Sequence, residues 1–434
     1  MARVRKFLPA RVDVAHLISA GVLASVCPRQ LIEEVLAQTG KASQRERLLP
    51  APAVVYYVMA LALWREAPLE EVLRVVCEGL QWLSDGKAGA VQASKSAISQ
   101  ARSRLGSEVM EQLAHRVLRP LATPDAPGAW YRGLRVMAVD GSCMEVADEA
   151  ANAAFFGYPG ASRGHSAFPQ ARVLGLVECG THAVVAADIA PYRRSEIAMA
   201  TQLLPAKVQP DMLVLADRNF YSFKLWQATC ATGAKLAWRV KSSLRLPVEQ
   251  RFSDGSYLST VFDSKDQKRT SGQSVRVIDY TLHGTATPTL DSYRLVTNIL
   301  DPDAAPALEL AALYHERWEI EGVFDEFKTH LRSNSTVLRS KTPDLVQQEL
   351  WGLLLAHFAI RQLMTRAAWP RGLDPDRLSF THAVRVIKRK MPQAAAVPPL
   401  SAWVPGETRC PRRSPKVAAS AAAVVPILVE YVAR

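Results

Sequence analysis

The sequence is poor in cysteine and has no long hydrophobic run, and each absence excludes a class of protein. Six cysteines are scattered over 434 residues without a Cys-x-x-Cys pair, so neither a disulfide scaffold nor a structural zinc site is expected. The longest apolar run near the start, Ala53 to Trp64, has 12 residues, which is too few to cross a bilayer. No signal-like segment follows the basic N-terminus. We therefore expect a cytoplasmic protein with free thiols and no membrane partner.

The composition is that of a globular protein with an excess of positive charge. Hydrophobic residues make up 49% and charged residues 22% of the chain, and the formal net charge is +12. A basic balance favours a polyanionic partner, and nucleic acid fits better than a membrane because no basic amphipathic anchor stands out. The length predicts two or three domains.

Residues 1–125 are predicted to be all α-helical, because apolar residues recur at helical spacing between Pro, Gly and Ser breaks. Within this region, Ser94 to Leu105 has the character of a DNA-recognition helix capped by Ser94. Its polar face would present Lys95, Gln100, Arg102 and Arg104. An ordinary surface helix is the competing interpretation.

The pattern changes to β after a linker rich in Pro and Gly at residues 120–130. Strands are predicted at 135–140, 171–178, 183–189, 212–217 and 235–240, with helices at 196–204 and 222–232. The order β-β-β-α-β-α-β is that of a ribonuclease-H-like α/β core.

The predicted core is interrupted once and followed by a basic tail. We assign residues 130–241 and 293–370 to its two parts and residues 242–292, rich in turns and alternating strands, to a β-rich insertion. A single long helix is predicted at 305–332. The tail, 371–434, is either a DNA-contacting arm or a solubilising end; its basic residues include Arg409, Arg412, Arg413 and Lys416.

The helix around residues 313–331 has two distinct faces. Its apolar stripe consists of Ile320, Val323, Phe327 and Leu331. At about 100° per residue, a second face gathers a phenol, a guanidinium, a carboxylate and an ammonium, which belong to Tyr314, Arg317, Glu321 and Lys328. Taken alone, this face is also compatible with a solvated, ion-paired surface.

Two aspartates end short apolar runs. Asp140 is the last residue of LRVMAVD and Asp217 is the last residue of MLVLAD. Carboxylates at the C-terminal ends of buried strands lie where open α/β sheets bind ligands. Together with Glu321 they could hold two Mg²⁺ ions for phosphodiester chemistry. An Asp that merely forms a turn is the alternative for either position. By contrast, Asp188 is not expected to bind metal, and His182 is expected to form structural hydrogen bonds.

The spacing Y-x2-R-x3-E-x6-K at Tyr314, Arg317, Glu321 and Lys328 resembles the signature of the insertion-sequence-four family of bacterial DDE transposases. The segments VDGS (139–142), FPQAR (168–172), ECGTHA (178–183) and LADRNFYS (215–222) resemble the regions around the family's two aspartates. The resemblance covers most of the chain.

This resemblance implies a ribonuclease-H-like core and an N-terminal helical domain that binds terminal inverted repeats in double-stranded DNA. It implies Mg²⁺-dependent strand cleavage and strand transfer at Asp140, Asp217 and Glu321, with two Mg²⁺ ions per site or Mn²⁺ in their place. The residues expected to grip DNA phosphate are Tyr314, Arg317 and Lys328, while Trp318 would stack on a base or pack in the core.

The resemblance further implies a homodimer on DNA that cuts out the element, through a hairpin intermediate, and joins it to target DNA. The expected location is the bacterial cytoplasm, in association with the nucleoid. Two alternatives stay open: a catalytically inactive relative that only occupies inverted repeats, and a cellular ribonuclease-H-like DNA nuclease.

Overall fold

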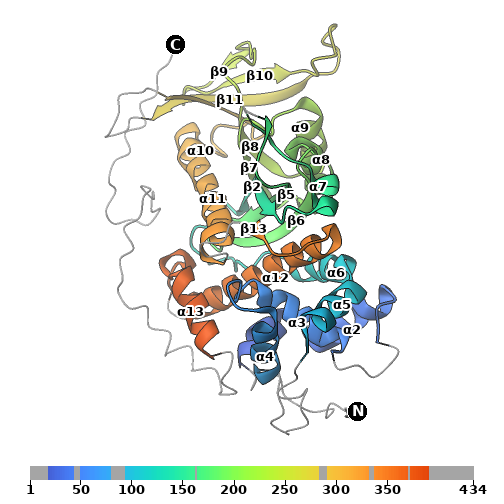
Figure 1. Ribbon diagram of the computed structural model, residues 1–434. Coiled ribbons are helices and arrows are strands. Elements are labelled where there is room, and N and C mark those ends of the chain that lie inside the picture. Colours follow the sequence, from blue (N-terminus) through green and yellow to red (C-terminus); the bar gives the residue numbers. More distant parts are fainter. Residues whose placement is uncertain are drawn as a thin grey trace.

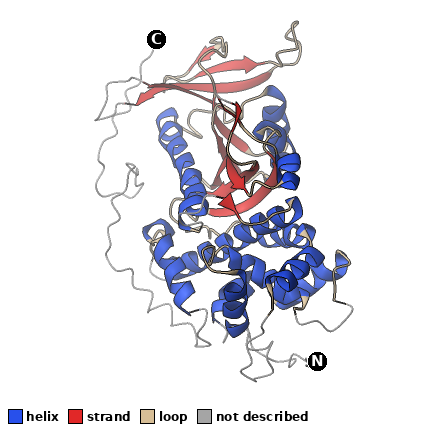
Figure 2. Cartoon of the chain, viewed as in Figure 1, coloured by secondary structure: helices blue, strands red, loops and turns tan. Residues whose placement is uncertain are grey.

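The computed structural model describes residues 18–43, 49–79, 93–161, 164–282, 291–331, 337–369 and 372–390. The four tail residues Arg409, Arg412, Arg413 and Lys416 lie outside this part of the chain. The described residues form a helical layer beneath a mixed α/β layer built on one large sheet (Figures 1 and 2). None of the described helices is long and apolar enough to cross a membrane.

A central sheet of 11 strands runs through the described α/β layer. In spatial order its main path is β6 (Ala183–Pro191), β5 (Gln170–Glu178), β2 (Leu134–Val146), β7 (Met212–Ala216), β8 (Lys235–Arg239), β12 (Asp291–Thr297), β11 (Gln273–Leu282), β10 (Tyr257–Val261) and β9 (Gln250–Arg251). The short strands β1 (Trp130–Tyr131) and β13 (Val337–Leu338) also pair with β2. A separate pair is formed by β3 (Gly160–Ala161) and β4 (Gly164–His165).

The longer elements follow the predicted β-β-β-α-β-α-β order. Along the chain they are β2, β5, β6, α8 (Glu196–Lys207), β7, α9 (Phe223–Cys230) and β8. Strands β2, β7 and β8 are parallel, whereas β5 and β6 are antiparallel to their neighbours. The small helix α7 (Ala150–Phe156) lies between β2 and β3.

Strand β2 divides the core into two halves. Val136 and Ala138 face the core that includes the helical segment at residues 307–331, whereas Met137 and Val139 pack with α8 and α9, as the alternation of strand side chains requires. The strand was expected to end at Asp140, but it continues to Val146 because β5 pairs with it along this length. Asp140 therefore lies inside β2, at the point where β7 ends.

The helical layer combines both ends of the described chain. Its members are α1 (Ile18–Val26), α2 (Arg29–Gln38), α3 (Ala51–Leu61), α4 (Leu69–Gly79), α5 (Lys95–Leu105), α6 (Ser107–Val117), α12 (Pro343–Ala368) and α13 (Phe380–Lys390). The 26-residue helix α12 is buried along most of its length, as predicted from its apolar character, because other helices and the sheet surround it. One continuous core joins the N-terminal helices, α12 and the sheet.

The segment predicted as one helix at 305–332 is instead a broken helical run. It consists of α10 (Ala307–Tyr314), the 3₁₀ turn η3 (His315–Arg317), α11 (Trp318–Asp325) and the π turn η4 (Glu326–His330). The tighter turn and the wider turn flank the part that carries Glu321, and such irregular turns change the angular spacing of side chains. The run lies along one side of the sheet, while α8 and α9 lie along the other (Figure 1).

The predicted insertion does contain strands, but they do not form a separate sheet. Strands β9, β10 and β11 extend the central sheet through β12, which pairs antiparallel with β8. A short 3₁₀ turn, η6 (Pro375–Arg377), connects the region after α12 to α13. The division of the chain into domains at the predicted boundaries stays a prediction.

Helix α5 has the predicted N-cap, since the Ser94 hydroxyl accepts the backbone N–H of Ala97 at 3.2 Å. Lys95, Gln100 and Arg104 are exposed. The guanidinium of Arg102 is buried against the start of α12, where it donates to Gln348 Oε1 at 2.8 Å and to Ser340 Oγ at 3.0 Å. In this structure Arg102 joins the N-terminal helices to α12 and does not offer its charge to a phosphate.

We predict that Arg102→Ala lowers the free energy of unfolding by about 2–3 kcal/mol, because it leaves the buried acceptors around the guanidinium without a donor. Equilibrium denaturation monitored by circular dichroism measures this loss. Arg104→Ala, an exposed change on the same helix, is the matched control and should shift stability by no more than about 0.5 kcal/mol. Equal effects of the two changes would contradict the structural role of Arg102.

Candidate active site

The two predicted aspartates lie side by side on neighbouring parallel strands. In the ladder between β2 and β7, Val139 pairs with Ala216, and the next residue on each strand is Asp140 or Asp217. Adjacent strands are about 4.8 Å apart, so the two carboxylates emerge next to each other. The parallel direction of the strands brings together two residues that are distant in sequence.

Arg317 connects the helical run to this strand edge. Its side chain is buried, with Nη1 3.3 Å from Asp140 Oδ2 and Nη2 3.3 Å from Glu321 Oε1. Burial lowers the pKa of Arg317, but Tyr314 and the carboxylates of Asp140, Asp217 and Glu321 outweigh that effect and raise it overall. Arg317 thus bridges Asp140 on the sheet and Glu321 on the helical run, and Asp217 is close enough for its charge to raise the pKa of Arg317.

Asp140 is the most perturbed of the three acidic groups. Burial raises its pKa to about 6, although the backbone N–H of Gly141 and the charge of Arg317 both lower it. The neighbouring carboxylates of Glu196 and Glu321 raise it further. The raised pKa of Asp140 therefore comes mainly from its burial, with a smaller contribution from the two nearby carboxylates.

The site has the ligand chemistry of a hard divalent cation. It offers oxygen donors from three carboxylates, which suit Mg²⁺ or Mn²⁺. The guanidinium of Arg317 donates to Asp140 and Glu321, and its Nε atom is buried with no hydrogen-bond partner among the described residues. A phosphate oxygen would satisfy that donor.

The other residues of the predicted helix face lie in different environments. The buried Tyr314 hydroxyl donates to the carbonyl of Ala216 at 3.3 Å, one residue before Asp217. Lys328 is exposed. Burial raises the pKa of Cys143 on β2, and the charges of Arg172 and Lys328 only partly oppose it. Trp318 is 50% exposed, and the Arg317 guanidinium lies 5.2 Å from the centre of its ring. Trp318 is therefore not a core residue.

Several neighbouring polar residues have structural partners. Asp188 is paired with Arg194 at 3.5 Å, consistent with its exclusion as a metal ligand. Sequence reasoning missed Glu196, at the start of α8, which is held by Arg172 at 2.5 Å and contacts the backbone of Gly141. The sequence feature that goes with Glu196 is Gly141, because a Cβ atom at that position would lie 2.6 Å from the Glu196 side chain.

Comparisons with known proteins identify the family of this chain. The family described as "Insertion element 4 transposase N-terminal" matches residues 17–115, and the family described as "Transposase DDE domain" matches residues 131–359, more than half of the chain. Transposase InsG for insertion sequence element IS4 of Escherichia coli (strain K12) is 29% identical over 366 residues, covering 83% of this chain and 80% of that protein.

Among solved structures, the piggyBac transposase synaptic complex with hairpin DNA is similar over 86% of this chain and 80% of that chain, with 10% sequence identity and a TM-score of 0.44. The family assignment itself rests on the sequence matches to the catalytic and N-terminal regions. The chain belongs to the insertion-sequence-four family of DDE transposases, and it is an enzyme that acts on DNA.

Proposed function

We propose that the chain is the cut-and-paste transposase of a bacterial insertion sequence, with Asp140, Asp217 and Glu321 as its catalytic residues. The observation that carries this proposal is the contact of the buried Arg317 guanidinium with Asp140 and Glu321, together with the β2–β7 pairing that ends beside Asp140 and Asp217. Water would cleave one strand at each end of the element, leaving a 3′-hydroxyl as the nucleophile. Attack of that hydroxyl on the opposite strand would form a hairpin, and after its opening the 3′-hydroxyl would attack target DNA.

Asp140, Asp217 and Glu321 would hold two Mg²⁺ ions, with Mn²⁺ able to replace them. Bound divalent cations activate the attacking oxygen and stabilise the leaving oxygen in phosphodiester chemistry. Arg317, buried between two of the carboxylates, would donate its unused Nε–H to the scissile phosphate. Tyr314 would support the strand end at Asp217, and the exposed Lys328 would neutralise DNA phosphate.

The exposed residues of α5 and the net positive charge support binding of the terminal inverted repeats by the helical layer. Lys95, Gln100 and Arg104 would contact this DNA, whereas Arg102 would not. Both ends of the element must be cut and joined in one complex, so we propose a homodimer on DNA in the bacterial cytoplasm.

Asp140→Asn, Asp217→Asn and Glu321→Gln are each predicted to abolish metal-dependent cleavage of the element's own end DNA while leaving DNA binding intact. Each change removes a charged ligand oxygen but preserves side-chain size. Purified protein, Mg²⁺ or Mn²⁺ and labelled end DNA resolved on a denaturing gel provide the measurement, which also displays hairpin and strand-transfer products.

Asp188→Asn is the control, because Asp188 is an acidic strand residue paired with Arg194 away from the three carboxylates. Full cleavage by any of the three active-site variants would reject the proposal. Binding without cleavage by the unmodified protein would favour the inactive relative. Cleavage without joining of a pre-cut end would favour a nuclease.

Arg104→Gln is predicted to weaken binding of all end sequences alike and to reduce the slope of log affinity against log salt by about 1, as expected for loss of one phosphate contact. Fluorescence anisotropy at several salt concentrations measures both quantities. Arg74→Gln is the matched control, since Arg74 is an exposed arginine of α4 ion-paired with Glu71. If both variants bind like the unmodified protein, α5 does not contact DNA through Arg104.

Trp318→Ala is predicted to reduce binding of a nicked end by about 1–3 kcal/mol, the usual contribution of one base stacked on an aromatic ring. Trp318→Phe should recover part of this loss. A 2-aminopurine placed at the terminal base reports unstacking by its fluorescence. A signal that is the same for the unmodified protein and Trp318→Ala would place the stacking residue elsewhere.

A further inference from the structure

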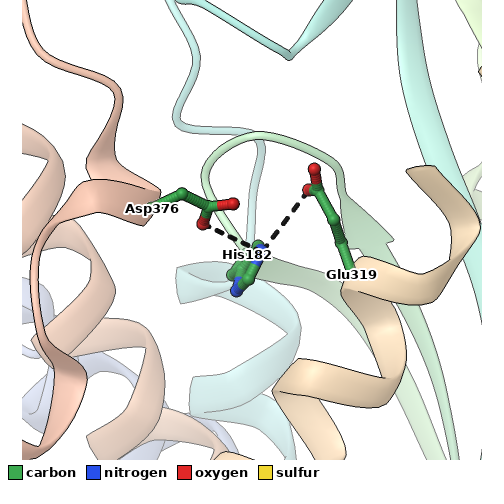
Figure 3. A group of neighbouring side chains, drawn as sticks. All are labelled: His182, Glu319 and Asp376. Atoms are coloured by element: carbon green, nitrogen blue, oxygen red, sulfur yellow. Dashed lines mark ion pairs between the residues drawn. The ribbon is translucent and has the colours of Figure 1, made fainter. Parts of the chain in front are cut away.

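A buried charged cluster lies behind the helix that carries Glu321. His182, in the turn between β5 and β6, has its Nε2 atom 2.9 Å from Asp376 Oδ1 and 3.4 Å from Glu319 Oε2. Figure 3 shows the imidazole between the two carboxylates, which come from η6 and α11. The three side chains therefore join segments that are widely separated in the sequence.

Glu319 is thus a first anchor of the helical run, and a second anchor, Glu326, lies at the start of η4. Glu326 accepts from the guanidinium of Arg361, with Nε at 3.0 Å, and contacts His357 Nε2 at 2.8 Å. Burial favours the neutral acid, but Arg361, His182 and His357 reverse this effect and hold the pKa of Glu326 far below its usual range. Glu326 is thus an ionised, buried carboxylate tied to α12, the central helix of the lower layer.

The two anchors lie on one side of the helical run. Glu319 and Glu326 are seven residues apart, which places them within roughly 20° of each other at about 100° per residue. Glu321 is two residues after Glu319 and therefore lies about 200° away, on the opposite side, which faces Asp140. Glu319 and Glu326 hold the back of the helix, one before and one after Glu321 in the sequence. Together they constrain the rotation of the helix and its position along its own axis.

The turn that contains Gly180 and His182, which contacts Glu319, is itself held in place. The backbone N–H of Gly180 donates to Glu319, and Gly180 has φ of 81°. A Cβ atom there would lie 2.7 Å from the carbonyl carbon of Gly128, so the turn packs directly on the linker backbone. His182 adopts φ of 57°, a left-handed conformation that is unfavourable for a non-glycine residue. The surrounding contacts must stabilise this strained turn.

The position of Arg361 distinguishes this cluster from a metal site, although His182, Glu319 and Asp376 could each supply a ligand atom. Arg361 Nη2 lies 2.6 Å from His182 Nδ1, and a guanidinium can only donate hydrogen bonds. Nδ1 must therefore accept, so the ring carries its proton on Nε2, the atom facing the two carboxylates. Burial lowers the pKa of His182, but Asp376 and Glu319 outweigh it and favour that proton. A metal bound at Nε2 would require the opposite tautomer.

We infer that this cluster, with Glu319 and Glu326 as positioning residues, sets the orientation of Glu321 and Arg317 towards Asp140 and so determines the geometry of the catalytic carboxylates. The inference rests on the proposed roles of Asp140, Asp217 and Glu321. Weakening an anchor would let the helix rotate or slide while the strand residues Asp140 and Asp217 stay in place. A displacement of about 1 Å in a catalytic group can cost on the order of 100-fold in rate.

Glu326→Gln tests the inference in the full-length protein, with Glu349→Gln as the matched control. Glu349 is also a buried carboxylate near an arginine, 3.8 Å from Arg65, but it lies on α12 and its partners are outside α11. We expect Glu326→Gln to cleave end DNA at least about tenfold more slowly than the control in single-turnover reactions. We also expect its half-saturating Mn²⁺ concentration to rise severalfold, with affinity for end DNA and thermal midpoint similar to the control.

Equal cleavage rates and equal Mn²⁺ dependence in the two variants would overturn the inference. Should Glu326→Gln not fold, Glu319→Gln decides by the same measurements, because an amide oxygen can still accept from Gly180 while the charge is lost. One equivalent of zinc in the purified protein, lost in Glu319→Gln, would also overturn it in favour of a metal site. Cleavage by Asp140→Asn would reject the proposed function itself, whereas an inactive Asp140→Asn beside a fully active Glu326→Gln would reject only the positioning role.

Discussion

The ion pairs of one buried guanidinium connect the two parts of this protein that matter for chemistry. Arg317 belongs to the helical run and Asp140 belongs to the central sheet, and the arginine also pairs with Glu321 one turn along its own helix. Buried carboxylates are costly unless a positive charge lies close to them. The arrangement therefore stabilises the carboxylate of Asp140 inside the central strand β2, next to Glu321 on the helical run.

The rest of the fold keeps Arg317, Asp140 and Glu321 in their relative positions. Parallel pairing of β2 with β7 brings Asp140 and Asp217 together, and the core shared by α12 and the N-terminal helices supports the face of the sheet beneath the helical run. Behind that run, Glu319 and Glu326 bind His182 and Arg361. Front and back of the same helix thus carry buried charge, and each side depends on the other for its position.

Much of the architecture was predictable from local patterns. Short apolar runs indicated the core strands, the Ser94 cap indicated α5, and the spacing from Tyr314 to Lys328 indicated the helix face that carries Glu321. These features depend on side chains close together in sequence, where periodicity is informative. The irregular turns η3 and η4 were not predictable in this way, because helical spacing alone does not reveal a change in the hydrogen-bond register.

The sequence by itself determined which residue types were available, the order of the core elements and the family to which the chain belongs. Only the tertiary structure decided which charges are exposed and which face the interior. Arg102 and Arg104 are two residues apart on α5, yet one is buried against α12 and the other is exposed. His182 is surrounded by Glu319, Arg361 and Asp376, which lie far along the chain. The reason is physical: the environment of a charged side chain is set by the neighbours that folding brings to it, and these neighbours are distant in sequence.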